Sequence, residues 1–133
     1  MSTLVVLDAS AGVEIVLRTT RGEALLTSLE SRDAVVIAPS HFLVEGASAL
    51  RRLERSGEVE RDRARFAIAR LTQLVTPAAL DDLIVDAWAL RENLTVADAL
   101  YVVLVRRTGA ALMTTDERML GAPGLEDLPV LRI

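Results

Sequence analysis

The sequence predicts an α/β fold, a three-layer α/β/α sandwich with a mainly parallel central sheet. Three observations lead to this prediction. Continuous apolar runs rich in Val, Leu and Ile recur along the chain, as expected for strands that are buried on both faces. Stretches with helical periodicity separate these runs, which favours right-handed crossovers between parallel strands. No linker or low-complexity segment interrupts the 133 residues, so we expect a single domain, residues 1–133.

Five apolar runs are predicted to form the strands. The first, residues 4–7, ends at Asp8, and the second, residues 35–38, ends at Pro39. The other three predicted strands are residues 74–76, 110–113 and 130–133.

The segments between the strands have the apolar spacing that is typical of helices. The predicted helices cover residues 11–17, 21–30, 40–55, 58–71, 79–91 and 95–107. Ser40 is expected to cap the third of these helices, whereas Gly57 and Gly109 follow two predicted helix ends, where glycine is common.

The composition excludes several classes of protein. The chain has no cysteine, which rules out disulfide scaffolds and zinc ribbons, and its single histidine, His41, argues against a histidine-rich zinc site. Residues 4–7 are too short an apolar run for a signal peptide or a membrane span, so we expect a cytoplasmic protein. The glycine-rich phosphate-binding motifs of the common nucleotide folds are also absent.

Four acidic residues lie where a predicted strand ends or a predicted helix begins: Asp8, Glu45, Asp98 and Asp116. In an open parallel sheet these positions share one edge, outside the carboxyl ends of the strands. Each acid has an alternative role, because Asp8, Asp98 and Asp116 are well placed to cap helices and Glu45 is compatible with a solvent-facing position. Independent caps would not need to share one edge, however, so we expect the four side chains to form a site.

Clustered carboxylates need a cation. At a separation of 5 Å and an effective dielectric constant of 20, two carboxylates repel each other by roughly 3 kcal/mol, and the chain has no lysine to offset this repulsion. Oxygen ligands without nearby His or Cys favour Mg²⁺ or Mn²⁺. Such ions activate water and stabilise the leaving oxygen in the hydrolysis of phosphodiesters. Ser10, Thr114 and Thr115 are expected to orient the carboxylates or water at the metal, unless they only make turn and capping hydrogen bonds.

All 15 basic residues are arginines, although the net charge is −4. The forked guanidinium group suits phosphate better than an ammonium group does. Three arginines follow Glu45 along its predicted helix and are expected to contact a nucleic-acid backbone: Arg51, Arg52 and Arg55. The alternative is a solvated helix face with acidic partners one turn away.

Four segments in order resemble the PIN domain, and more narrowly the VapC toxins of VapBC toxin–antitoxin pairs. They are Leu-Asp-Ala-Ser (7–10), the segment around Glu45 (41–50), Leu-Thr-Val-Ala-Asp-Ala-Leu-Tyr (94–101) and Met-Thr-Thr-Asp-Glu-Arg-Met-Leu (113–120). The resemblance covers nearly the whole chain. It implies a PIN-like fold and a Mg²⁺- or Mn²⁺-dependent endoribonuclease that acts on structured RNA such as tRNA or rRNA. It also implies a homodimer and a small antitoxin protein as a partner.

The resemblance also implies roles for the four acids. Asp8, Asp98 and Asp116 fall on family positions that would hold the metal, and Glu45 falls on a position for a further ligand or for the group that orients the attacking water. Some members of the family have another acid shortly after the last one, where this chain has Arg118 and Met119. The resemblance therefore leaves the number of metal ions, one or two, open.

Two alternative functions are excluded because the chain lacks a residue that each requires, and a third alternative remains. A phosphoaspartate receiver needs a lysine, which the chain lacks, and a haloacid-dehalogenase-type phosphatase needs an aspartate where Ser10 stands. The remaining alternative is a catalytically silent PIN-like interaction module whose acidic pocket binds an Arg-rich partner segment.

Tyr101 and Trp88 are expected to be packing residues. The apolar residues of the first two predicted helices are expected to pack in the core or to line a groove for the antitoxin: Val13, Ile15, Val16, Leu25 and Leu26.

Overall fold

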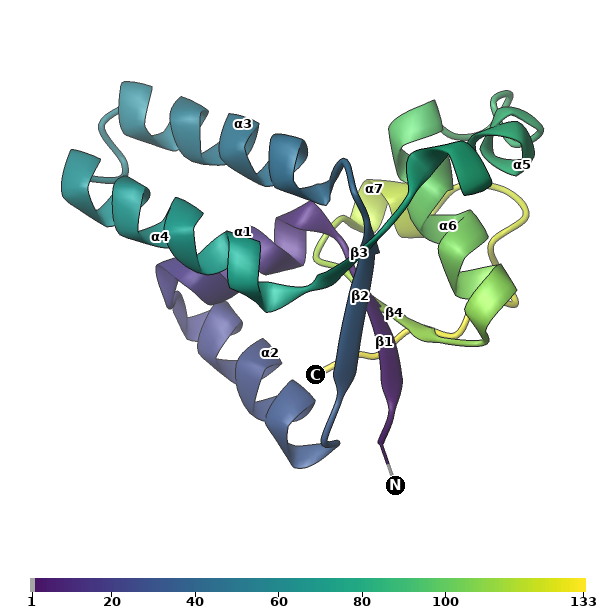
Figure 1. Cartoon of the computed structure of the whole chain (residues 1–133), viewed down its shortest axis with the longest axis horizontal. Helices are drawn as coiled ribbons and strands as arrows, with labels where there is room; N and C mark the ends of the chain where they lie inside the picture. Colours follow the sequence, from purple (N-terminus) through teal and green to yellow (C-terminus); the bar gives the residue numbers. More distant parts are fainter. Residues whose placement is uncertain (1) are drawn as a thin grey trace.

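The computed structural model describes residues 2–133 and shows a four-stranded sheet in which all strands are parallel (Figure 1). The strand order is β3-β2-β1-β4. β1 (Leu4–Leu7) lies between β2 (Val35–Pro39) and β4 (Ala111–Met113), and β3 (Thr76–Ala78) forms the edge beside β2. The predicted three-layer α/β/α sandwich with a mainly parallel sheet is confirmed.

Helices cover both faces of this sheet. In Figure 1, α1, α2, α3 and α4 lie on one side of the strands, and α5 and α6 lie on the other. The helices are α1 (Ala9–Leu17), α2 (Thr20–Ser31), α3 (Phe42–Arg55), α4 (Arg61–Leu74), α5 (Ile84–Trp88), α6 (Val96–Thr108) and α7 (Glu117–Leu120), with a short 3₁₀ helix η1 (Leu80–Asp82) before α5. None of the helices in residues 2–133 has both the length and the apolar character that a membrane span requires.

The position of the strands in the core explains why their sequences are uninterrupted apolar runs. Val5, Val6 and Leu7 of β1 are fully buried because β1 has a strand on each side and helices on each face. Residues 99–105 of α6 are all buried as well, so this helix is enclosed rather than amphipathic. Each such buried aliphatic side chain contributes roughly 1.5–3 kcal/mol, and together they fix the edge of the sheet from which the acids project.

Two predicted details near β2 and β3 are wrong. Ser40 does not cap α3: the helix begins at Phe42, His41 occupies the capping position, and its side chain makes no capping hydrogen bond. The backbone N–H of Ser40 instead donates to the carbonyl of Ala78, which extends the pairing between β2 and β3. The strand predicted at 74–76 is shifted to Thr76–Ala78, because α4 continues through Leu74.

The predicted helix 79–91 is broken into η1 and α5. Leu83 and Ala87 are the buried residues of this segment, and they lie one turn apart, so tertiary packing supports little more than a single turn. The predicted C-terminal strand is reduced to one parallel bridge, between Val130 and Leu112.

Candidate active site

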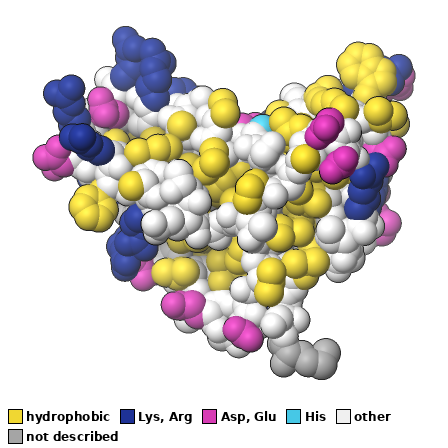
Figure 2. All heavy atoms as spheres, in the orientation of Figure 1, with side chains coloured by type: hydrophobic (Ala, Val, Ile, Leu, Met, Phe, Trp, Pro, Cys, Tyr) yellow, Lys and Arg dark blue, Asp and Glu magenta, His cyan; other side chains and the backbone are white. Residues whose placement is uncertain are grey.

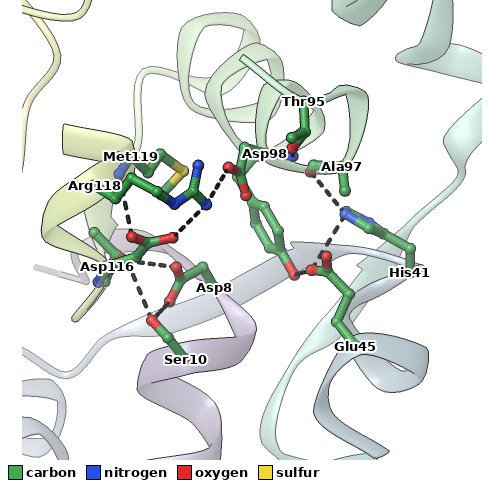
Figure 3. Close-up of polar contacts among 12 residues, drawn as sticks. Asp8, Ser10, His41, Glu45, Thr95, Ala97, Asp98, Asp116, Arg118 and Met119 are labelled. Carbon is green, nitrogen blue, oxygen red and sulfur yellow. Dashed lines mark hydrogen bonds and ion pairs between the residues drawn. The ribbon is translucent and has the colours of Figure 1, made fainter. Parts of the chain in front are cut away.

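The fold brings the four predicted acids to the carboxyl edge of the sheet. Asp8 follows β1 directly, and Asp116 precedes α7, shortly after β4. Asp98 and Glu45 lie in the first turns of α6 and α3. Figure 3 shows Asp8, Asp98 and Asp116 facing one another, with Glu45 beside them. All four acids therefore lie at the sheet edge to which the predicted topology assigned them.

Asp8 is the most enclosed of these acids, with 5% of its surface exposed. Its Oδ1 atom accepts hydrogen bonds from the backbone N–H of Ala11, at 3.0 Å, and from the hydroxyl of Ser10, at 2.7 Å. Its Oδ2 atom accepts a hydrogen bond from the hydroxyl of Thr114. Burial raises the pKa of Asp8, the nearby charge of Asp116 raises it further, and the three hydrogen bonds only partly oppose this shift. Asp8 thus caps α1 and belongs to the acidic site at the same time.

The predicted hydroxyl residues connect Asp8 to the loop after β4. The hydroxyl of Thr114 accepts a hydrogen bond from the backbone N–H of Asp116, at 2.9 Å. The hydroxyl of Ser10 accepts one from the backbone N–H of Thr115, at 3.1 Å. Ser10 and Thr114 therefore orient the Asp8 carboxylate through their side chains, whereas Thr115 takes part through its backbone.

Asp98 and Asp116 are joined by a cation from the chain itself. The Nη2 atom of Arg118 lies 3.0 Å from Oδ2 of Asp98 and 3.1 Å from Oδ2 of Asp116. The hydrogen bond to Asp98, followed by the charges of both aspartates, raises the pKa of Arg118, which stays charged. Both aspartates are also held at helix starts, because Thr95 accepts a hydrogen bond from the N–H of Asp98 and Asp116 accepts one from that of Met119.

Glu45 is held by a network between α3 and α6. The hydroxyl of Tyr101 donates to Glu45 Oε1 at 2.7 Å. His41 Nε2 donates to the carbonyl of Ala97 at 2.9 Å and lies 3.5 Å from the same Glu45 oxygen, with its ring 4.8 Å from the Tyr101 ring. Burial, and then the charge of Glu45, raise the pKa of Tyr101, so its hydroxyl remains a donor.

Sequence reasoning missed three residues of this site: Tyr101, which was expected only to pack, His41 and Arg118. For two of them, Tyr101 and His41, the sequence separation from a predicted acid indicated a place near the site. Tyr101 follows Asp98 by three residues and Glu45 follows His41 by four, so each pair shares a helix face. Trp88, in contrast, is 59% exposed and stacks with Arg91 rather than packing in the core.

The donor set suits a hard divalent cation, although the carboxylates do not enclose one as they stand. Within residues 2–133, no three His, Cys, Asp or Glu side chains are grouped closely enough to hold a metal ion. The side chain nearest to both Asp98 and Asp116 is the guanidinium group of Arg118, which marks the space between them as one that accepts positive charge. The carboxylates of Asp8, Asp98 and Asp116 provide the oxygen ligands that Mg²⁺ and Mn²⁺ prefer.

The three arginines predicted to contact nucleic acid are exposed on α3, but they do not all share one face of the helix. Arg52 follows Glu45 by seven residues, about two helical turns, and so lies on the same face as Glu45. Arg51 instead lines a groove between α3 and α4 together with Arg61 and Arg65. Figure 2 shows arginine side chains gathered over the ends of α3 and α4 that lie away from the sheet.

The apolar residues of α1 and α2 lie mainly in the core. Val13, Ile15, Val16 and Leu25 are buried, whereas Leu26 is half-buried. Val16 and Leu26 nevertheless line pockets to which an exposed phenylalanine of α4, Phe66, also contributes.

The family follows from comparison with known proteins. Residues 5–125 match the family model of the PIN domain. This chain belongs to the PIN-domain family. Among PIN-domain relatives, ribonuclease VapC3 of Mycobacterium tuberculosis is 40% identical over 116 residues, which cover 86% of this chain and 84% of that protein. Ribonuclease VapC1 of the same species is 34% identical over 122 residues, covering 90% of this chain and 91% of that protein.

A solved structure supports the fold independently. The crystal structure of PAE2754 from Pyrobaculum aerophilum superposes with a TM-score of 0.66 at 21% identity, covering 89% of this chain and 78% of that one. The family model and the VapC relatives confirm the resemblance to VapC-type PIN domains that the four sequence segments carry.

Proposed function

We propose that this PIN-domain protein is a Mg²⁺- or Mn²⁺-dependent endoribonuclease and the toxin of a toxin–antitoxin pair. The convergence of Asp8, Glu45, Asp98 and Asp116 on one sheet edge, in a chain whose relatives are named ribonucleases, carries the proposal. The relatives support the class of reaction, and the oxygen donor set supports the use of a divalent ion.

In the proposed site Asp8, Asp98 and Asp116 hold the metal, and Glu45 is a further ligand or the group that orients the attacking water. A bound ion would neutralise charge on the scissile phosphate and lower the pKa of nearby water. The residues of the chain would orient the groups around the ion. Because Oε1 of Glu45 accepts the hydrogen bond from Tyr101, the carboxylate is held in one direction and Oε2 remains for water.

The hydroxyl groups around Asp8 likewise orient its carboxylate. Ser10 and Thr114 each donate to one oxygen of Asp8 and each accept a backbone N–H from the loop after β4. Rotation of the carboxylate would break several hydrogen bonds at once, so Asp8 is held in one orientation in which it could bind an ion.

We expect the products to carry a 5′-phosphate and a 3′-hydroxyl, from in-line attack of water with the 3′ oxygen as the leaving group. The chain's single histidine, His41, is mostly buried and directs Nε2 at the carbonyl of Ala97. It is therefore not placed to form the acid–base pair of metal-free ribonucleases, which produce 2′,3′-cyclic phosphates.

The partners in this proposal are an RNA substrate, a cognate antitoxin protein and a second copy of the chain, in the cytoplasm. Arg52, on the face of Glu45, is the best placed of the three α3 arginines to follow the RNA backbone from the site. A catalytically silent interaction module is the alternative. It leaves unexplained why the hydroxyls that orient Asp8 and Glu45 accompany all four acids.

The test is cleavage of total cellular RNA by purified, partner-free protein, beside the variants Asp8→Asn and Asp98→Asn. Discrete fragments that require Mg²⁺ and disappear in both folded variants are expected. Fragments that persist in EDTA, or that end in a 2′,3′-cyclic phosphate, would contradict the mechanism. Absence of cleavage by the wild type with every RNA class, with partner binding unaffected by Asp8→Asn, would favour the silent module.

A further inference from the structure

Arg118 connects two of the acids that are proposed to bind the metal. It belongs to α7, two residues after Asp116, and reaches across to α6. A single guanidinium nitrogen, Nη2, lies within 3.1 Å of Oδ2 of both Asp98 and Asp116 (Figure 3). The two oxygens that face each other across the site therefore share one positively charged donor.

The exposures of the three side chains show which of them is most accessible to solvent. Asp98 and Asp116 have 14% and 26% of their side-chain surface exposed, whereas Arg118 has 69%. The carboxylate of Asp116 also accepts a hydrogen bond from the N–H of Met119, and the backbone N–H of Asp98 donates to Thr95. Arg118 makes no other hydrogen bond or ion pair that would hold its side chain within residues 2–133. The two carboxylates thus lie mostly buried, whereas Arg118 is an exposed cation that lies over them.

We propose that Arg118 competes with the divalent ion for Asp98 and Asp116 and leaves them when the ion binds. This inference rests on the proposed metal-dependent function. A guanidinium group and a divalent ion relieve the same repulsion between carboxylates. A carboxylate oxygen that accepts a hydrogen bond from the guanidinium is therefore less available to coordinate the ion. Ion pairs of exposed side chains are weak and are screened by salt, so the ion is able to displace Arg118.

The consequence is that the protein itself sets how much metal it needs. With Arg118 in place, part of the negative charge of Asp98 and Asp116 is neutralised and the apparent affinity for the ion is lowered. Removal of Arg118 is therefore expected to strengthen metal binding, whereas removal of an arginine that helped to build the metal site would weaken it.

The experiment measures Mn²⁺ binding to the RNA-free full-length protein by isothermal titration calorimetry, in the wild type and in Arg118→Gln. We expect Arg118→Gln to bind Mn²⁺ about three- to tenfold more tightly, a tenfold change being about 1.4 kcal/mol. Binding by Arg118→Gln that is detectable where that of the wild type is not would support the proposal equally. Unchanged or weaker binding in Arg118→Gln would overturn it.

Arg132→Gln is the matched control for net charge. Arg132 lies at the same edge, close to Thr114 and Thr115, and its nearest acidic partner is Glu117, at 4.0 Å. It loses the same charge without touching Asp98 or Asp116, so we expect its Mn²⁺ affinity to change by less than about twofold, given the screening of exposed charges by salt. An equal gain in both variants would show that only net charge matters and would contradict direct competition.

The two proposals fail in different ways. If the wild type binds Mn²⁺ and cleaves RNA but Arg118→Gln binds no more tightly, the competition is wrong and the nuclease stands. If neither protein binds Mn²⁺, and wild-type cleavage does not depend on metal, the metal-dependent function and the competition both fall.

Discussion

The hydroxyl oxygen of Tyr101 lies 2.7 Å from Oε1 of Glu45, and Tyr101 follows Asp98 by one turn of the same helix. One helix, α6, therefore supplies an acid of the site and also the donor that orients an acid on α3. Because Tyr101 is 1% exposed, its ring is fixed by the core, and the position of its hydroxyl is as well defined as that of a backbone group. Core packing thus determines the geometry between Asp98 and Glu45.

Tyr101→Phe should separate this orienting role from packing. The ring is retained, so we expect a stability loss of about 1 kcal/mol, typical of one hydrogen bond. Cleavage should slow by about tenfold in kcat with little change in KM, because Glu45 loses its orientation and not its charge. Single-turnover RNA cleavage and urea unfolding measure the two effects. The control is Trp88→Phe on α5, and an unchanged kcat in Tyr101→Phe would show that the hydroxyl has no part in the reaction.

Asp8→Asn should stabilise the metal-free protein near neutral pH. Because burial raises the pKa of Asp8 in the folded state, the folded protein binds a proton more strongly than the unfolded chain does. The ionised carboxylate is thus a destabilising feature that appears as the pH rises above the unfolded value of 3.8 and through the folded pKa. The Tm of Asp8→Asn should exceed that of the wild type at about pH 7, and the difference should shrink toward about pH 4.

Metal should reverse that order. An ion that binds the ionised Asp8 stabilises only the wild type, by mass action. Thermal unfolding with and without Mg²⁺ therefore provides a second measurement on the same two proteins. A Tm for Asp8→Asn that stays below that of the wild type at every pH without metal would contradict the destabilising role of the buried charge.

Arg52→Gln should weaken RNA binding and reduce its dependence on salt. Loss of one phosphate contact lowers the slope of log K against log salt by about 0.7–0.9. Fluorescence anisotropy with a catalytically inactive Asp98→Asn background keeps the RNA intact during the titration. Arg32→Gln, at the exposed end of α2, is the control. Equal slopes for Arg52→Gln and Arg32→Gln would assign Arg52 to a solvated helix face.

Gly22→Ala should be severely destabilising, since α2 approaches the end of α1 too closely for a side chain. A Cβ atom at Gly22 would lie 1.9 Å from the backbone oxygen of Glu14, which cannot move without distorting α1. We expect a loss of about 3 kcal/mol, the upper end of overpacking effects, measured by urea denaturation. Gly121→Ala is the control, since the nearest atom to its Cβ would be 3.5 Å away, and equal losses in both would contradict the steric argument.

The sequence predicted the position of the acids better than their surroundings. Asp8, Asp98 and Asp116 adjoin strong apolar runs or helix starts, so topology alone places them on one edge. The contacts of Arg118 and Tyr101 depend on how α6 and α7 are rotated relative to the sheet, which the packing of the whole core decides. No local pattern reports this rotation, and the spacing of Asp98 and Tyr101 shows only that they share a helix face.

The weaker predictions failed where local signals and packing disagreed. Residues 79–91 have helical composition, but only Leu83 and Ala87 are fully buried, so the segment breaks into two short turns. Ser40 has a side chain suited to capping, yet its backbone pairs with Ala78, and α3 starts two residues later. In both cases a long-range contact outweighed an intrinsic preference.

Asp8, Glu45 and Asp98 all lie at the amino ends of their helices, α1, α3 and α6. The aligned peptide dipoles of each helix place partial positive charge at that end, and each is worth about 0.3–1 kcal/mol to a nearby anion at low ionic strength. The backbone therefore offsets part of the mutual repulsion of these carboxylates before any ion arrives. The three helix ends therefore make folding of the chain less dependent on any ligand that neutralises these carboxylates.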